Sequence, residues 1–142
     1  MEKNYQLFVY GSLRSGFRHP AFQYISRHFS FVANGKIKGI VFDIGGYPGG
    51  VKTMHESFIA GELYAIKSED EFDWAMAQID DYEGVDAEQK VTALFKRALT
   101  EVYLDSGEKT KAWVYWYNGD VSNKPVIASG DTIQYYQQKN KV

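Results

Sequence analysis

Apolar residues occur along this chain in short runs separated by glycine-containing turns, a pattern typical of β-strands. The first run covers residues 5–10, and Gly11 follows it directly. Further strands are predicted over residues 36–44, 58–66, 93–104 and 110–117. The glycine-rich run from Gly45 to Gly50 is predicted to be a turn, and the segment 105–109 is predicted to join the last two strands as a hairpin.

Helical spacing is confined to three segments. The first helix is predicted over residues 20–29, with proline in its first turn. Ser68 followed by Glu71 forms a capping-box pattern, and apolar residues at helical spacing continue from there until Gly84. A short terminal helix is predicted to begin near Asp131.

The order of these elements indicates the fold class. Strands dominate, and strands and helices do not alternate regularly as they do in parallel α/β folds. We therefore predict an α+β fold, a small mixed curled β-sheet or β-barrel with two to three flanking helices. The 142 residues contain neither a repeat nor a linker, so we expect one domain, residues 1–142.

Composition narrows the possible chemistry. The chain has no cysteine, which excludes disulfides, thiolate catalysis and cysteine-ligated zinc, and its three histidines do not favour a histidine-rich metal site. A formal charge of −2 does not fit nucleic-acid binding. With no apolar run long enough for a membrane span and no signal-peptide pattern, we expect a soluble, cytoplasmic protein. The aromatic content of 16% suits strands and a pocket lined by rings.

The loop after the first strand is one candidate for chemistry. Tyr10-Gly11-Ser12-Leu13 follows a buried strand, where unpaired backbone N–H groups can bind a carboxylate or a developing oxyanion. Arg14 is a further partner for an anion. An ordinary strand-ending turn explains the same pattern, and the loop lacks the spacing of a phosphate-binding P-loop.

Glu83 is the second candidate. It lies at the C-terminal end of the predicted second helix, close to Asp80 and Asp81. The helix dipole and acidic neighbours disfavour a carboxylate there and raise its pKa, as a general acid/base near neutral pH requires. A solvated acidic helix end is the alternative explanation. Tyr47, within the glycine-rich run, either presents its ring to a ligand or covers the core.

Several of these segments together resemble the γ-glutamylcyclotransferase-like family, which includes AIG2-like and γ-glutamylamine cyclotransferase proteins. The resemblance rests, in order, on Phe8-Val9-Tyr10-Gly11-Ser12-Leu13-Arg14, Tyr47-Pro48-Gly49, Gly61-Glu62-Leu63-Tyr64, Ile79-Asp80-Asp81-Tyr82-Glu83-Gly84, Phe95-Lys96-Arg97, Ala112-Trp113-Val114-Tyr115 and Ser129-Gly130-Asp131. It covers residues 6 to 131. Phe95 replaces the family's common Tyr, and Thr132 stands where a Trp often follows, a change we expect to affect packing only.

The resemblance implies an activity. In this family the α-amine of a γ-glutamyl substrate attacks its own γ-carbonyl, giving 5-oxoproline and a released amine without a metal or organic cofactor. The resemblance assigns Glu83 as the catalytic acid/base, and it implies that backbone N–H groups of the first loop hold the substrate. The predicted substrate-binding residues are Tyr10, Gly11, Ser12, Leu13, Arg14, Tyr47 and Tyr117.

Two other functional classes fit the same residues. A non-catalytic module could use the pocket to bind a small amino-acid-like ligand, although such a module has little use for Glu83. An interaction protein would need the aromatic face of residues 113–117 to be exposed. The expected partner is a small γ-glutamyl molecule, with neither nucleic acid nor membrane involved, and the sequence does not indicate the oligomeric state.

Overall fold

A computed structural model of the protein describes residues 5–10, 20–44, 48–54, 56–83 and 95–139. Its strands are β1 (Gln6–Val9), β2 (Phe29–Asp43), β3 (Pro48–Lys52), β4 (Phe58–Ile66), β5 (Phe95–Leu104) and β6 (Lys109–Tyr117). Its helices are α1 (Pro20–His28), the 3₁₀ turn η2 (Glu69–Glu71), α2 (Phe72–Glu83) and α3 (Thr132–Lys139). The predicted strand over residues 58–66 coincides with β4, and the first and last two predicted strands agree to within two residues at each end.

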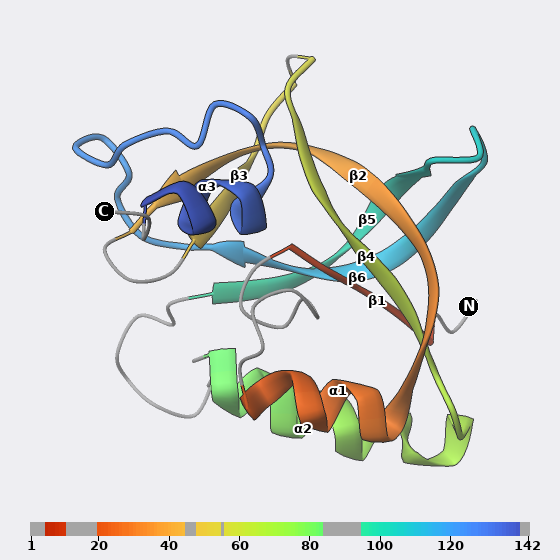
Figure 1. The fold of residues 1–142 in the computed structure, drawn as a ribbon. Helices are drawn as coiled ribbons and strands as arrows, with labels where there is room; N and C mark the ends of the chain where they lie inside the picture. The colour runs from red at the N-terminus through yellow and green to blue at the C-terminus, as the bar shows by residue number, and fades with distance from the viewer. Residues whose placement is uncertain (1–4, 11–19, 45–47, 55, 84–94, 140–142) are drawn as a thin grey trace.

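The strands form one strongly curled sheet (Figure 1), in the order β3-β2-β4-β1-β6-β5. A further antiparallel pairing of Gly35 with Leu104 and of Lys36 with Tyr103 joins β2 to β5. This contact closes β2, β4, β1, β6 and β5 into a barrel and leaves β3 attached to β2 beside it. The predicted α+β fold, a curled sheet or barrel with a few helices at its edge, is confirmed.

Side-chain alternation along the strands builds two separate cores. Phe8, Ile37 and Leu63 belong to the cluster inside the barrel. Leu7 and Val9 point to the other face of β1, where they pack beneath α1 and α2. These two helices lie together on one side of the sheet (Figure 1). Both faces of a strand can therefore be buried, which explains why the central strands are apolar almost throughout.

The second helix begins differently from the prediction. Ser68 is extended and its side chain makes no capping hydrogen bond. The backbone N–H of Glu71 instead donates to the Ser68 carbonyl at 3.0 Å, which produces the tight turn η2 before α2 begins at Phe72. The capping-box prediction was wrong because this 3₁₀ hydrogen bond uses the N–H group that the serine hydroxyl would have accepted from.

Two strand predictions also need correction. β2 begins at Phe29, not residue 36, and its early half has a register shift between Phe31 and Ala33 that breaks the apolar-polar alternation. The run from Gly45 to Gly50 is not a turn throughout, because Pro48, Gly49 and Gly50 belong to β3 and pair with the end of β2. The glycines at these positions allow the rings of Tyr10 and Tyr117 to pack closely against β3.

The terminal helix is confirmed near its predicted start. Asp131 accepts the backbone N–H of Gln134 through Oδ1 at 3.1 Å, which caps α3. The Tyr135 hydroxyl then donates to the buried Asp43 at 2.9 Å, and this bond ties α3 to the end of β2. Within the described ranges, the helices are too short or too polar to cross a membrane.

Candidate active site

Tyr10, the residue directly after β1, joins two strands that do not pair with each other. Its hydroxyl donates to the Tyr115 carbonyl of β6 at 2.7 Å and accepts the Gly50 N–H of β3 at 2.8 Å. Tyr10 is 4% exposed, so water does not replace these bonds. The parallel pairing of β1 with β6 is limited to Leu7 and Trp113, which leaves room for the ring to reach between the strands. Tyr10 therefore fixes the end of the barrel from which the predicted substrate loop starts.

The two glycines of β3 allow this arrangement. A Cβ atom on Gly50 would lie 3.0 Å from Cζ of Tyr10, and one on Gly49 would lie 2.8 Å from Cγ of Tyr117. Both distances are shorter than ordinary van der Waals contact. Tyr10 and Tyr117, two of the predicted substrate-binding residues, therefore pack against adjacent residues of β3.

The outer face of this end is aromatic and is covered by α2. Phe95 and Tyr117 are cross-strand partners, and their rings meet edge to face with centroids 5.5 Å apart. Ile79 of α2 belongs to the same buried cluster as these two residues. Because Glu83 is the last residue of α2, one helical turn beyond Ile79, the helix ends at the same end of the barrel as β1 and β6 (Figure 1).

Thr132 helps to hold Tyr10 in place, which the sequence did not predict. It is fully buried, and its hydroxyl donates to the backbone carbonyl of Tyr10. Beyond the packing role that we expected at this departure from the family's common Trp, the threonine links the start of α3 to the end of β1 by a hydrogen bond.

A buried carboxylate on β4 is a further residue that sequence reasoning did not assign to the site. Glu62 is 6% exposed, lies opposite Val9 in the strand register, and accepts a hydrogen bond from the Tyr64 hydroxyl at 2.8 Å. The available signal was an acidic residue in an otherwise apolar strand. Its neighbour Gly61 carries no Cβ because that atom would come within 2.4 Å of the Val9 carbonyl oxygen.

Some predicted site residues are not located. The side chain of Glu83 and the residues Gly11, Ser12, Leu13, Arg14 and Tyr47 lie outside the described part of the chain. Their assignment as catalytic or substrate-binding residues stays a prediction. An interaction protein would need the aromatic face of residues 113–117 to be exposed, but Tyr115 and Trp116 are only 4% and 5% exposed and Trp113 and Tyr117 are partly buried.

Comparisons with known proteins place this architecture. Residues 7–135 match the family model described as gamma-glutamyl cyclotransferase, AIG2-like. A protein of Methanocaldococcus jannaschii, provisionally named a gamma-glutamylcyclotransferase, is 30% identical over 131 residues, covering 91% of this chain and 96% of the relative.

Solved structures agree with the fold. YkqA from Bacillus subtilis superposes with a TM-score of 0.69 at 22% identity, covering 98% of this chain, and this chain spans only 44% of YkqA. A structure titled gamma-glutamyl cyclotransferase superposes with a TM-score of 0.57 at 13% identity, covering 86% of this chain and 69% of the other. Because the family match extends over most of the sequence, the chain belongs to the gamma-glutamyl cyclotransferase, AIG2-like family.

Proposed function

We propose that the protein is a γ-glutamylcyclotransferase that converts a small γ-glutamyl-amine or γ-glutamyl-amino acid into 5-oxoproline and a free amine. Membership of the family supports the reaction class. The observation that carries the site is the convergence at one end of the barrel of the end of β1, the Tyr117 ring and the end of α2, whose last residue is Glu83.

The chemistry needs two protons to pass from the attacking nitrogen to the leaving nitrogen. The substrate α-amine is protonated at neutral pH, and Glu83 removes a proton so that the nitrogen lone pair can attack the γ-carbonyl carbon. The new N–C bond closes the five-membered lactam. As the original γ-amide C–N bond breaks, Glu83 delivers this proton to the leaving nitrogen. The ring nitrogen gives up a second proton, which passes to the released amine in the same way, so that the lactam keeps one N–H and the amine leaves as an ammonium ion. No water is consumed, so the products have the same atoms as the substrate.

Positioning supplies the rest of the acceleration. The reaction is intramolecular, and holding the extended glutamyl chain in a folded near-attack conformer removes much of the entropic cost. Backbone N–H groups of Gly11, Ser12 and Leu13 are proposed to hold the substrate, with Arg14 and Tyr47 beside them. Tyr10 contributes by fixing the base of that loop, since its hydroxyl is already bonded to β3 and β6.

The test is a direct assay for both products. The protein is incubated with a panel of γ-glutamyl-amino acids and γ-glutamyl-alkylamines, and 5-oxoproline and the free amine are measured by mass spectrometry. Equimolar release of both products is expected from at least one compound. The N-acetylated form of that compound has no nucleophilic amine and is expected to be inert. Release of amine from it would indicate hydrolysis and contradict the proposal.

Glu83 is tested on the confirmed substrate. Glu83→Gln keeps the size of the side chain but cannot accept a proton, and we expect turnover to fall about 10²–10⁴-fold. The melting temperature is expected to stay unchanged or rise slightly, since a charge disfavoured by the helix dipole is removed. Asp81→Asn is the matched control and is expected to keep most activity. Retention of more than about a tenth of wild-type turnover by Glu83→Gln would contradict the assignment. Binding of the panel without any turnover would favour the non-catalytic module.

A further inference from the structure

The barrel has an opening on the side away from α1 and α2. β2 and β5 pair at two positions, Gly35 with Leu104 and Lys36 with Tyr103, and the strands separate beyond them. A pocket of about 360 Å³ occupies this seam, which is within the size range of small-molecule sites. It is lined by Lys38, Lys52, Thr53, Met54, Leu99, Thr100, Glu101 and Trp116. We call it the seam pocket.

Trp116 forms the apolar floor of the seam pocket. Its indole Nε1 donates to the Thr100 hydroxyl at 3.1 Å, which satisfies the donor and fixes the ring between β6 and β5. Gly39 permits this placement, because a Cβ there would lie 3.0 Å from Cζ3 of the indole. With its N–H group already bonded, Trp116 offers a ligand no hydrogen bond. Its ring is only 5% exposed beneath Lys52, so its apolar face becomes available to a ligand when the exposed Lys52 side chain moves off it.

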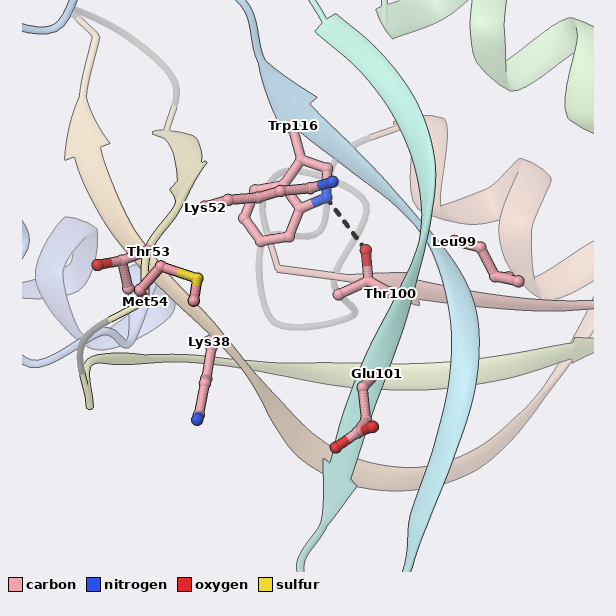
Figure 2. A pocket seen from close by; sticks show the side chains of 8 residues that line it. All are labelled: Lys38, Lys52, Thr53, Met54, Leu99, Thr100, Glu101 and Trp116. Atoms are coloured by element: carbon pink, nitrogen blue, oxygen red, sulfur yellow. Dashed lines mark hydrogen bonds between the residues drawn. The ribbon is translucent and has the colours of Figure 1, made fainter.

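Two lysines give the seam pocket its charge. Lys52 extends across the indole (Figure 2), with Nζ 5.7 Å from the ring centroid, near the outer limit of a cation–π contact. Within the described part of the chain, neither Lys52 nor Lys38 forms an ion pair. Glu101 is the acidic residue of the lining. Its Oε1 lies 3.9 Å from Nζ of Lys109, a residue that does not line the pocket. The two lysines are therefore available to an anionic group.

We propose that the seam pocket binds a small organic anion, a carboxylate attached to a flat apolar body. The apolar body lies against Trp116 and the methylene groups of Lys52, and the carboxylate pairs with the ammonium group of Lys52. The ammonium end of Lys38 points away from Lys52 in the structure (Figure 2), and we propose that this exposed side chain turns toward the bound carboxylate. This site is separate from the proposed active site. Trp116 faces the barrel interior, whereas its neighbour Tyr117 packs on the opposite face with the residues beneath α2.

An NMR titration with 2-naphthoate tests the proposal, with 2-naphthamide as the uncharged control ligand. The indole N–H signal of Trp116, assigned with Trp116→Phe, is expected to shift saturably with naphthoate. The same shift with naphthamide should need about tenfold more ligand, because only the carboxylate pairs with the lysines. The signals of Trp74 and Trp113, which do not line the seam pocket, should stay in place.

Variants test whether the charges of Lys38 and Lys52, and not nonspecific apolar contact, account for naphthoate binding. The double variant Lys38→Met, Lys52→Met keeps the apolar stems and is expected to weaken naphthoate binding about tenfold without changing the fold. Lys36→Met is the matched control, since Lys36 is also on β2 and also contacts a ring, that of Phe58 at 4.4 Å, but lies outside the pocket. Equal affinity for naphthoate and naphthamide, unchanged binding in the double variant, or an equal loss in Lys36→Met would each overturn the proposal.

Discussion

The end of the barrel at Tyr10 and the seam pocket at Trp116 use the same packing device for different purposes. In each, an aromatic ring lies against a glycine where a Cβ atom would come within about 3.0 Å of it, Gly50 for Tyr10 and Gly39 for Trp116. The polar ends of the two rings differ. The Tyr10 hydroxyl joins β6 and β3 through two hydrogen bonds, whereas the Trp116 N–H makes one, to the partly buried Thr100.

Because of this difference, we expect Tyr10 to act as a structural support and Trp116 to act as a receptor, that is, to contact a ligand. Tyr10 has no remaining hydroxyl proton to give a ligand, so its contribution to the proposed active site is rigidity. Trp116 borders a cavity, and the side chain that lies over it, Lys52, is exposed. A ligand can therefore displace Lys52 without breaking a buried hydrogen bond. Changes at Tyr10 should affect stability strongly, and changes around Trp116 should affect stability less.

The largest stability effect is expected from Tyr10→Phe. This change leaves the Gly50 N–H and the Tyr115 carbonyl without the hydroxyl that joins them in a buried setting, which should cost about 2–4 kcal/mol in the free energy of unfolding. Urea denaturation measures it. Tyr5→Phe is the control, because in the described structure the Tyr5 ring packs on Phe72 and its hydroxyl makes no hydrogen bond. A loss for Tyr10→Phe as small as that of Tyr5→Phe would show that the hydroxyl is not a support.

Gly39→Ala should have the next largest effect. Its Cβ would lie 2.8 Å from Cδ1 of Ile59 and 3.0 Å from both the Val51 carbonyl and the Trp116 ring. Overpacking of this kind costs about 1–3 kcal/mol. The indole N–H signal of Trp116 is expected to move, because the ring must shift. Gly107→Ala gives the contrast: its φ of 96° is strained for alanine, but nothing lies within 4 Å. It should destabilise the protein and leave the Trp116 signal in place.

The sequence predicted the frame of the molecule well, because alternation and glycine-containing turns report local structure directly. β4 and the Gly107 turn between β5 and β6 are examples, since each depends on residues close together in the chain. β3 was missed because Gly49 and Gly50 look like turn residues unless the rings that pack on them are known. The early half of β2 was missed because its register shift disrupts the alternation on which the prediction depends.

The site was predictable only in part, for the same reason. Tyr10 was identified from its place after the first strand, but its hydroxyl partners lie 40 and 105 residues away along the chain. No local pattern reports contacts of that range. Thr132 was identified as a departure from the family, yet its hydrogen bond to Tyr10 spans 122 residues. The buried carboxylate of Glu62 was visible only as an acidic residue within a strand.

Thr132→Val should lower the free energy of unfolding by less than Tyr10→Phe or Gly39→Ala. The substitution preserves the shape of a fully buried side chain and removes its hydrogen bond to the Tyr10 carbonyl, a loss of about 0.5–1.5 kcal/mol. Thr100→Val, which removes the acceptor of the Trp116 N–H, is expected to cost less, because that bond is only partly buried and water can replace it. Equal losses in urea denaturation would contradict the distinction between support and receptor.

The smallest effect is expected at Asp120, which lies outside both regions and provides a baseline for them. The Ser122 N–H donates to Asp120 Oδ1 at 2.9 Å, and this bond, assisted by the Ser122 side chain and by Lys124, lowers the pKa of the Asp120 carboxyl. A folded-state pKa below the unfolded value adds stability that is complete above the unfolded pKa and lost as the pH falls through the folded one. Asp120→Asn should therefore lower the melting temperature slightly at neutral pH, with the difference from wild type vanishing in acid.

Ser122→Ala provides the control. The pKa of the Asp120 carboxyl should return only part of the way toward its ordinary value, because the hydrogen bond from the Ser122 backbone N–H, the largest cause of the lowering, remains. A melting-temperature difference that persists unchanged at low pH would mean that the charge of Asp120 is not what stabilises this turn.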